Sequence, residues 1–267
     1  MIYGFIGLGN MAGAILRGMH RSGAFANDTL CGFNRSPGKT QVLQEEIGLK
    51  PMESARAVAE AADVLVLGVK PQMLPEVLPG IADLVTSDKL VVTIAAGRPL
   101  SFYAEAFGEA VPVVRVMPNI NARVGEAATA ICPNGAASEE QAELVRRMFR
   151  SVGEVFDIPE QQFAAFTAMA GSSGAFVHLY IDALASAGVK AGLPKKLAEA
   201  LACQATIGAA KLTKMSDEHP IALLDQVCSP AGSTIEGVHV LKKLGFETAV
   251  QQAAQAVIDK DAVLAGK

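Results

Sequence analysis

The sequence predicts an α/β fold, a doubly wound parallel sheet, followed by an all-helical domain. Two observations predict it. Up to residue 157, short apolar stretches alternate with helical ones, as they do in sheets covered by helices on both faces. After residue 157 the strand signals stop and long alanine-rich helical stretches take over. We therefore expect one domain at residues 1–157 and a second, helical domain at residues 158–267.

The first strand is expected at residues 3–6, and a glycine-rich loop separates it from a helical stretch. The loop reads Gly7-Leu8-Gly9-Asn10-Met11-Ala12, which is the G-x-G-x-x-A pattern in its required place between strand and helix. In this pattern the first glycine permits a tight turn and the second lets the backbone approach a pyrophosphate. The alanine keeps the helix close to the strand. The sequence thus predicts a Rossmann-like dinucleotide-binding domain, with these six residues as coenzyme ligands.

The second strand is expected at residues 30–33, and the residues after it bear on the choice of coenzyme. An acidic residue there would bind the ribose hydroxyls and repel a 2′-phosphate. This chain instead has Asn34-Arg35-Ser36. Because a guanidinium can donate bidentately to a phosphate, NADPH is the favoured coenzyme. NADH stays usable, since one arginine discriminates only moderately. The alternative for Arg35 is a solvated loop residue.

Three further apolar strands are expected at residues 64–69, 90–94 and 113–117. Ligands of such sheets bind outside the carboxyl ends of the strands. Lys70 and Asn119 follow two of these strands, so both are candidates to line the cleft, and a loop-capping role is the alternative for each. The residues assigned to the coenzyme in these loops are Val69, Lys70, Pro71, Gln72, Ala95, Ala96 and Gly97.

The second domain is predicted to hold helices at residues 163–170, 176–189, 195–214, 235–243 and 246–265. Several are apolar around much of their circumference and need more partners than this domain supplies, which predicts a homodimer. Residues 161–181 carry no formal charge and are long enough to span a bilayer. Their Thr, Gly, Ser and His residues and the lack of a basic flank favour a buried helical segment, interrupted near residues 171–174.

Residues 229–234 combine a turn with the start of a helix. They read Ser229-Pro230-Ala231-Gly232-Ser233-Thr234, and an apolar stretch with helical spacing follows. Ser233 or Thr234 is well placed to cap that helix. Hydroxyls and free N–H groups at a helix start form a site for a carboxylate or phosphate. A capped turn without a ligand is the alternative.

Composition excludes several classes of protein. The net charge is −4 without a basic stripe, which argues against a nucleic-acid partner. The predicted strand begins almost at Met1 with no leader before it, so we expect a cytoplasmic protein. The four cysteines and four histidines are scattered and lack the spacing of metal ligands, so no metal is expected.

Taken together, these motifs resemble those of the pyrroline-5-carboxylate reductase family over essentially the whole chain. The matching pieces, quoted at their first and last residues, are Phe5 to Ala12, Val69 to Gln72, Arg115 to Asn119, Ala187 to Pro194 and Ser229 to Thr234. The resemblance implies NAD(P)H-dependent reduction of the cyclic imine 1-pyrroline-5-carboxylate to L-proline, the last step of proline biosynthesis. It also implies a dimer formed by the helical domain and, in many members, further assembly of dimers.

The substrate pocket follows partly from the residues and partly from the resemblance. The turn offers N–H groups and hydroxyls, notably those of Ser229, Gly232 and Thr234, to the substrate carboxylate. Thr234 is also the catalytic candidate, since its hydroxyl can reach the ring nitrogen. By resemblance, Glu160, Asp225, Gln226, Val227 and Ser233 line or border the same pocket.

Two departures from the family pattern stand out. Where the family has Ser-Gly-Ser-Gly-Pro-Ala-Tyr, this chain has Ala170-Gly171-Ser172-Ser173-Gly174-Ala175-Phe176, which leaves the local backbone and the role of a tyrosine hydroxyl open. Ala231 replaces a common glycine, a minor change if its φ is negative.

Alternative functions are a related NADP-dependent imine or hydroxyacid reductase, or a non-catalytic NADPH-binding sensor. Hydroxyacid dehydrogenases of this kind use a lysine after the coenzyme domain, and residues 171–179 contain none, which counts against them.

Overall fold

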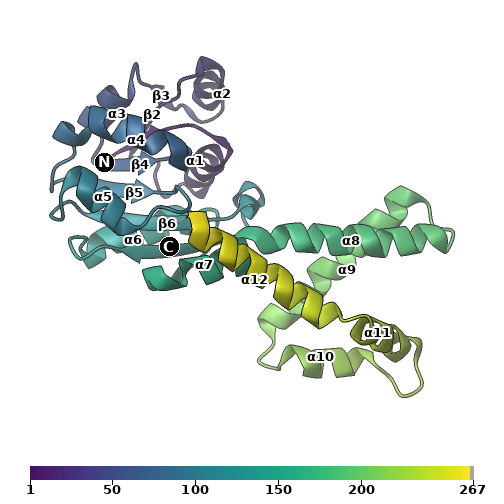
Figure 1. The fold of residues 1–267 in the computed structure, drawn as a ribbon. Helices are drawn as coiled ribbons and strands as arrows, with labels where there is room; N and C mark the ends of the chain where they lie inside the picture. Colours follow the sequence, from purple (N-terminus) through teal and green to yellow (C-terminus); the bar gives the residue numbers. More distant parts are fainter. Residues whose placement is uncertain (265–267) are drawn as a thin grey trace. The chain divides into compact units, whose positions relative to one another are not determined.

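The computed structural model describes residues 1–264 (Figure 1). They form two compact units. The first unit is Met1–Gly171 together with the chain from Ile258 onward, and the second unit is Ser172–Val257. The first unit therefore continues past Asp157, where the last strand ends, as far as Gly171. A functional boundary at residues 157/158 stays a prediction.

The first unit is built on one eight-stranded sheet with the order β3-β2-β1-β4-β5-β6-β7-β8. Strands β1 to β6 are all parallel, which confirms the predicted doubly wound sheet. β7 runs antiparallel to β6, and β8 pairs in parallel with β7. The strands are β1 (Ile2–Ile6), β2 (Thr29–Phe33), β3 (Lys50–Pro51), β4 (Val64–Leu67), β5 (Leu90–Thr93), β6 (Val113–Pro118), β7 (Ala127–Pro133) and β8 (Gly153–Asp157).

The reversal at β7 has a simple cause. Only the short 3-10 helix η4 (Ile120–Val124) connects β6 to β7. A parallel pair needs a crossover of a dozen or more residues, whereas an antiparallel pair can be joined by a short link. The sequence prediction contained neither β7 nor β8.

Helices cover both faces of the sheet (Figure 1). The side chains of each strand point alternately into the two apolar cores between the sheet and these helices. Tyr3 and Phe5 of β1 point into a core shared with α1 (Asn10–Ser22) and α6 (Glu139–Arg150). Ile6 points into the other core, with α3 (Ala55–Ala61) and α5 (Leu100–Phe107). Successive strand side chains point to opposite faces, so a sheet buried on both faces needs uninterrupted apolar strands. The remaining helices before β5 are α2 (Pro37–Ile47), η1 (Pro71–Met73), α4 (Leu74–Val77), η2 (Leu78–Gly80) and η3 (Ala82–Leu84).

The chain after β8, which includes the uncharged residues 161–181, is helical from residue 160 and has no gap. It contains η5 (Glu160–Gln162), α7 (Phe163–Phe166) and a π-helical stretch, η6 (Thr167–Ser172), which leads directly into α8 (Ser173–Lys190). The helix is irregular at the predicted place, because the π-helical stretch ends at Ser172, but the chain stays helical and Gly174 already lies in the first turn of α8. Within the part of the chain that the structure describes, no helix is long and apolar enough to cross a membrane.

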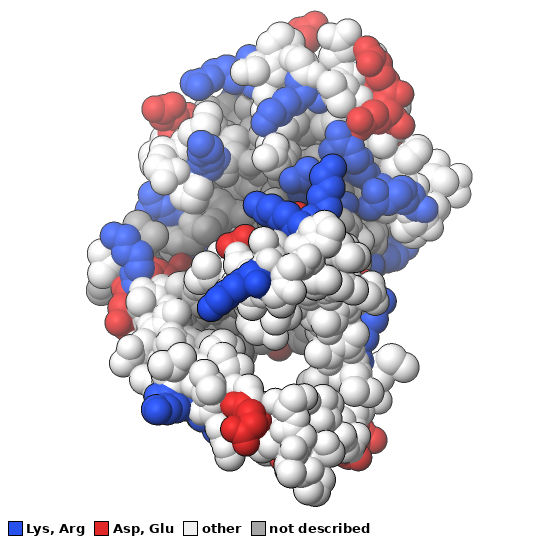
Figure 2. Space-filling model, turned by 90° about the vertical axis from the view of Figure 1, so that its right-hand side faces the viewer, with Lys and Arg blue, Asp and Glu red and all other residues white. Residues whose placement is uncertain are grey.

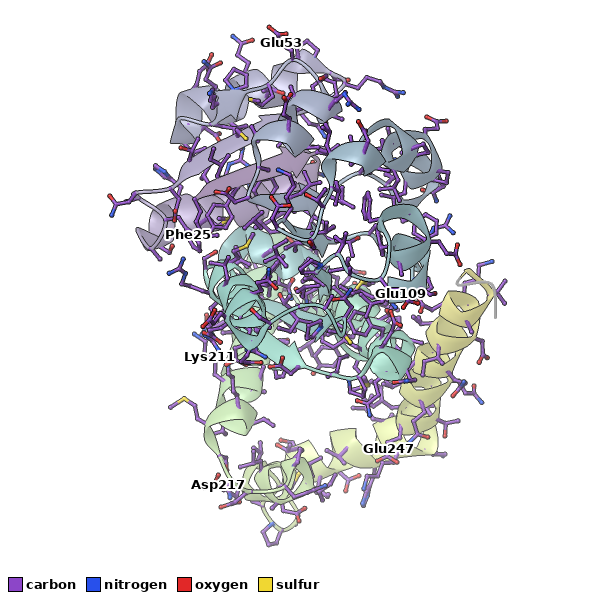
Figure 3. The ribbon with its side chains drawn as sticks, turned by 90° about the vertical axis from the view of Figure 1, so that its left-hand side faces the viewer. Phe25, Glu53, Glu109, Lys211, Asp217 and Glu247 are labelled. Atoms are coloured by element: carbon purple, nitrogen blue, oxygen red, sulfur yellow. The ribbon has the colours of Figure 1, made fainter. Side chains whose placement is uncertain are left out.

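The second unit is entirely helical. Its elements are α8, α9 (Lys195–Met215), α10 (Pro220–Val227), α11 (Ser233–Lys243) and the part of α12 (Phe246–Leu264) up to Val257. The predicted end of α12 at residue 265 lies outside the described residues. Figure 3 labels Lys211 on α9, Asp217 in the loop before α10 and Glu247 on α12. The sequence prediction missed α10, which has only two turns.

α8 and α9 pack closely around small residues. Ala185, Ala198 and Ala202 form the only buried cluster among the described residues of this unit. A Cβ on Gly188 would lie 3.2 Å from the Cβ of Ala198, so the missing side chain lets the two helices approach.

Candidate active site

The glycine-rich loop is fixed by its neighbour in the sheet. Gly7 has a φ of 92°, and a Cβ added to it would lie 2.7 Å from the backbone nitrogen of Val69. β1 and β4 are adjacent, so the loops that follow them meet at the carboxyl edge of the sheet. Only glycine tolerates both this φ and this close approach. Gly7 therefore serves the fold.

Gly9 has the opposite surroundings. It is the N-cap residue of α1, it has no side chain to cap the helix, and a Cβ added to it would meet nothing within 4 Å. The first N–H groups of an α-helix have no partner within the helix. Here they adjoin open space next to a glycine, which is where the backbone can approach an anionic phosphate. The geometry fits the pyrophosphate of a dinucleotide.

Asn34 holds the loop after β2 to the glycine-rich loop. Its Oδ1 accepts a hydrogen bond from the N–H of Leu8 at 3.1 Å, and its Nδ2 donates to the carbonyl of Ser36 at 2.9 Å. The carboxamide is thus used within the protein, and it positions Leu8 and Ser36. Arg35 next to it is exposed and has no acidic partner among the described residues.

A cavity of about 400 Å³ connects these two loops. Gly9, Asn10 and Ser36 line it, together with Arg17 and Lys39, two basic residues that the sequence analysis did not select. Lys39 lies three residues after Ser36, near the start of α2, so helical spacing could have identified it. Arg17 comes from the second turn of α1 and carried no comparable signal.

The loops after β4 and β5 are anchored by their own chain. Lys70 is exposed, and its carbonyl accepts from the N–H of Met73, so its backbone belongs to a turn. Ala95 is buried, and its N–H lies 3.4 Å from Oγ1 of Thr93. That hydroxyl is 2.5 Å from the hydroxyl of Tyr103, whose pKa burial raises to about 12. This buried pair fixes the start of the loop at residues 95–97.

Glu160 is tied to the sheet through Arg115. Its Oε1 accepts from Nη1 of Arg115 at 2.9 Å and from the N–H of Leu100 at 2.7 Å. The Arg115 guanidinium lies 4.2 Å from the centre of the Phe163 ring and is largely buried. These residues line a small cavity of about 90 Å³ that also includes Gly97 of the β5 loop. One oxygen of the Glu160 carboxylate is thus committed to holding the first unit together.

Asn119 likewise has a structural role. Its Oδ1 accepts from the N–H of Asn121 at 3.2 Å, and its Nδ2 donates to the carbonyl of Ala170 at 3.0 Å. Its side chain therefore links the end of β6 to the π-helical stretch. The loop-capping alternative describes Asn119 better than a cleft-lining role.

The turn at residues 229–232 lies in the second unit. The N–H of Gly232 donates to the carbonyl of Ser229 at 3.0 Å. A Cβ on Gly232 would lie 2.4 Å from Oγ of Ser229, so the turn closes tightly against that serine. Ala231 has a φ of 57°, the only positive φ outside glycine among the described residues. The replacement of the family's glycine by Ala231 is therefore not a minor change, because its φ is positive and the turn favours glycine at this position.

The helix start differs from the prediction in its cap. α11 begins at Ser233, its N-cap is Gly232, and no side chain caps it. The expected capping by Ser233 or Thr234 was therefore wrong, because both residues already lie in the first helical turn. Their hydroxyls are therefore not in the N-cap position, and the N-cap residue, Gly232, makes no side-chain hydrogen bond to the helix. The prediction that this helix start binds an anion does not depend on a side-chain cap.

The other predicted substrate residues are distributed over both units. Gln226 donates to Glu218 at 2.6 Å, and Val227 is 64% exposed at the end of α10. The structure thus brings Ser229, Gly232, Ser233 and Thr234 together, whereas Glu160 belongs to the first unit. Among the described residues, no group of three or more His, Cys, Asp or Glu side chains could hold a metal ion.

Two family models match the chain. The model described as "Pyrroline-5-carboxylate reductase dimerisation" matches residues 160–264. The model described as "NADP oxidoreductase coenzyme F420-dependent" matches residues 2–97, which include the glycine-rich loop and the loop after β2.

Relatives match over nearly the whole chain. The pyrroline-5-carboxylate reductase of Pisum sativum is 41% identical over 95% of this chain and 92% of its own length. That of Escherichia coli (strain K12) is 40% identical over 96% of each chain.

Solved structures agree. A pyrroline-5-carboxylate reductase from Coxiella burnetii is 31% identical, covers 98% of this chain and 97% of its own, and has a TM-score of 0.91. The Plasmodium falciparum pyrroline carboxylate reductase with NADP bound is 30% identical, covers 99% and 98%, and has a TM-score of 0.88. With these identities over nearly its full length, the chain belongs to the pyrroline-5-carboxylate reductase family.

Proposed function

We propose that the protein reduces 1-pyrroline-5-carboxylate to L-proline with NADPH, the last step of proline biosynthesis. The observation that carries this proposal is the coexistence of two open helix starts on one chain of this family. One, at Gly9, suits the diphosphate of a dinucleotide. The other, at Ser233 and Thr234, suits the carboxylate of a small substrate.

The coenzyme would be held by the first unit. The N–H groups after Gly9 face its diphosphate, and Arg35, Ser36 and Lys39 supply charge and hydrogen bonds for a 2′-phosphate. Asn34 keeps these two loops together. The remaining contacts come from the loops at residues 69–72 and 95–97. Bound NADPH would supply the hydride.

The substrate would be held by the turn and the first residues of α11. Their N–H groups and the Ser229 hydroxyl bind the carboxylate, and this contact persists from ground state to transition state. The Thr234 hydroxyl hydrogen-bonds the ring nitrogen and orients the imine carbon for attack. The protein thus works by positioning, since hydride transfer to a protonated imine needs no further side-chain chemistry.

The assembly that we propose is a homodimer formed through the second unit, with further association of dimers. The match of residues 160–264 to a dimerisation model supports it, as do the many exposed apolar side chains of this unit. We place the enzyme in the cytoplasm, which the free state of all four cysteines supports. Its partners are then the substrate, L-proline and a second copy of the chain.

The test is the absorbance of NADPH during incubation of the purified protein with 1-pyrroline-5-carboxylate, with L-proline measured as the product. Loss of NADPH absorbance matched one-to-one by L-proline is the expected result. Coenzyme binding without turnover would indicate the sensor alternative. Turnover only with another imine or with a hydroxyacid would indicate a related reductase.

A further inference from the structure

A second basic cavity lies beside α1, and the proposed reaction does not use its arginine residues. Its volume is about 380 Å³, and Asn10, Ala14, Arg17, Arg21 and Arg123 line it. The four residues from α1 are spaced three or four apart, so they lie on one face of the helix. Arg123 comes from η4, which packs against α1. Two elements far apart in the sequence thus build one cavity with three guanidinium groups.

The charges in this cavity are poorly balanced. Arg17 is paired with Glu46 at 2.6 Å, but Glu46 does not line the cavity. Arg21 and Arg123 have no acidic partner among the described residues, and no carboxylate lines the cavity. Figure 2 shows a face of the molecule on which several Lys and Arg side chains gather close together.

The helix dipole explains only part of this arrangement. Arg21 lies in the last turn of α1, where a positive charge is favourable. The dipole of α1 does not explain Arg123, because this residue comes from η4 and adds a like charge to the same cavity. Like charges gathered in one cavity repel each other, and a bound anion would remove this cost.

We propose that this cavity binds a diphosphate group, either free or as part of a nucleotide, at a second site that adjoins the coenzyme. Arginine side chains bind phosphate oxygens bidentately, and guanidinium groups from two directions can hold two adjacent phosphates. The volume exceeds what a single phosphate requires. The cavity shares Asn10 and Arg17 with the coenzyme cavity, so the site adjoins the coenzyme without including its loop after β2.

The test is calorimetric titration of inorganic pyrophosphate, ADP and adenosine into the full-length protein saturated with NADPH, which blocks the coenzyme site. We expect pyrophosphate or ADP to bind and adenosine not to bind. The double variant Arg21→Gln with Arg123→Gln should weaken this binding at least 10-fold. The control Lys196→Gln with Lys211→Gln removes the same charge from exposed positions on α9 and should leave it unchanged.

The outcomes separate the two sources of the ligand. Binding of both anions assigns recognition to the diphosphate alone, and binding of ADP only assigns it to a nucleotide. Equal binding by wild type and the Arg21/Arg123 variant, binding of adenosine as tight as that of ADP, or no binding at all would overturn the proposal. If the protein does not bind NADPH, the proposed function fails, and the same two variants are then compared without coenzyme.

Discussion

The two units of this protein bury very different amounts of apolar surface within one chain. In the first unit every strand from β4 to β6 is almost fully buried, and large side chains such as Tyr3, Phe5 and Phe149 are inaccessible. In the second unit the buried apolar residues among those described are Ala185, Ala198, Ala202 and Leu223. The larger side chains of its helices are mostly exposed. The first unit thus buries most of its large apolar side chains within the chain, whereas the second unit leaves most of its own exposed.

One face of α9 carries several large apolar side chains that are exposed in the single chain. Leu197, Leu201, Leu212 and Met215 are between 47% and 86% exposed. Residues 201 and 212 are eleven apart, close to three full turns, so these side chains form one stripe along the helix. Each buried leucine contributes about 1.5–3 kcal/mol. A stripe of this kind therefore favours association with a second copy of the chain.

The largest expected effect comes from charging that stripe. Leu201→Glu with Leu212→Glu should give a monomer and lower the reductase activity more than 100-fold, because each carboxylate would be buried without a partner. Sedimentation velocity and the NADPH assay measure the two effects. Ala210→Glu adds a charge to the same helix at an exposed position on the face opposite the stripe, and should remain a dimer. A fully active dimer from the double variant would place the interface elsewhere.

A pair of glycine substitutions tests the self-sufficiency of the first unit. Gly7→Ala should lower the free energy of unfolding by about 2–4 kcal/mol, from a strained φ and a clash with the Val69 backbone. Gly9→Ala should lower the free energy of unfolding by only about 0.5–1 kcal/mol, because its Cβ meets nothing and only the N-cap preference for glycine is lost. It should raise the Kd for NADPH about 10-fold or more by obstructing the diphosphate. Chemical denaturation and coenzyme titration measure the two effects. Equal losses of stability would mean that Gly9 also serves the fold.

Substitutions of coenzyme-binding residues in the first unit should change the affinity for the coenzyme and leave that for the substrate unchanged. Arg35→Asp should weaken NADPH far more than NADH, by on the order of 2–3 kcal/mol where the contact with the 2′-phosphate is desolvated. The KM for 1-pyrroline-5-carboxylate should not move. Steady-state kinetics with both coenzymes measures this, and equal shifts for NADPH and NADH would remove Arg35 from 2′-phosphate recognition.

Determinants in the second unit should act on the substrate. Thr234→Val keeps the shape but deletes the hydroxyl, and kcat should fall about 10- to 100-fold, as for one transition-state hydrogen bond of about 1.5–3 kcal/mol. Stability should change little, because Thr234 does not cap α11. Ser229→Ala should act mainly on KM, as a carboxylate contact common to ground and transition states. An unchanged kcat/KM in Thr234→Val would show that the Thr234 hydroxyl has no catalytic role.

The parts that could be predicted from the sequence are those with local signals. Buried parallel strands are continuous apolar runs, and Gly7 and Gly9 lie in a pattern with a fixed context, so β1, β2, β4, β5 and β6 were predictable. β7 and β8 were not, because their pairing depends on how short a connection is. Arg17 was missed because a cavity joins it to Ser36 only after α1 and α2 have packed, whereas Lys39 could have been identified from its spacing to Ser36. The positive φ of Ala231 could not be predicted either, since an alanine in the sequence does not indicate the sign of its φ.

The smallest expected effect concerns that alanine. Ser229 and Gly232 close a turn in which Pro230 takes the second position and Ala231 the third, with a φ of 57°. A left-handed φ costs an L-residue about 1–2 kcal/mol, whereas glycine avoids this cost but loses about 0.5–1 kcal/mol of chain entropy. Ala231→Gly should therefore raise the free energy of unfolding by about 0.5–1 kcal/mol, measured by denaturation at one fixed protein concentration.

The matched control is Ala26→Gly in a turn of the first unit, where φ is not positive. There the same substitution gains no relief from strain, so only the entropic loss remains and stability should fall by about 0.5 kcal/mol. Opposite signs at the two positions would locate the strain in the turn at residues 229–232. A loss at both positions would mean that contacts of the Ala231 methyl group outweigh its unfavourable φ. The turn would then be held by packing against a surface that a single chain does not provide, which would extend the dependence of the second unit on a partner to its proposed substrate site.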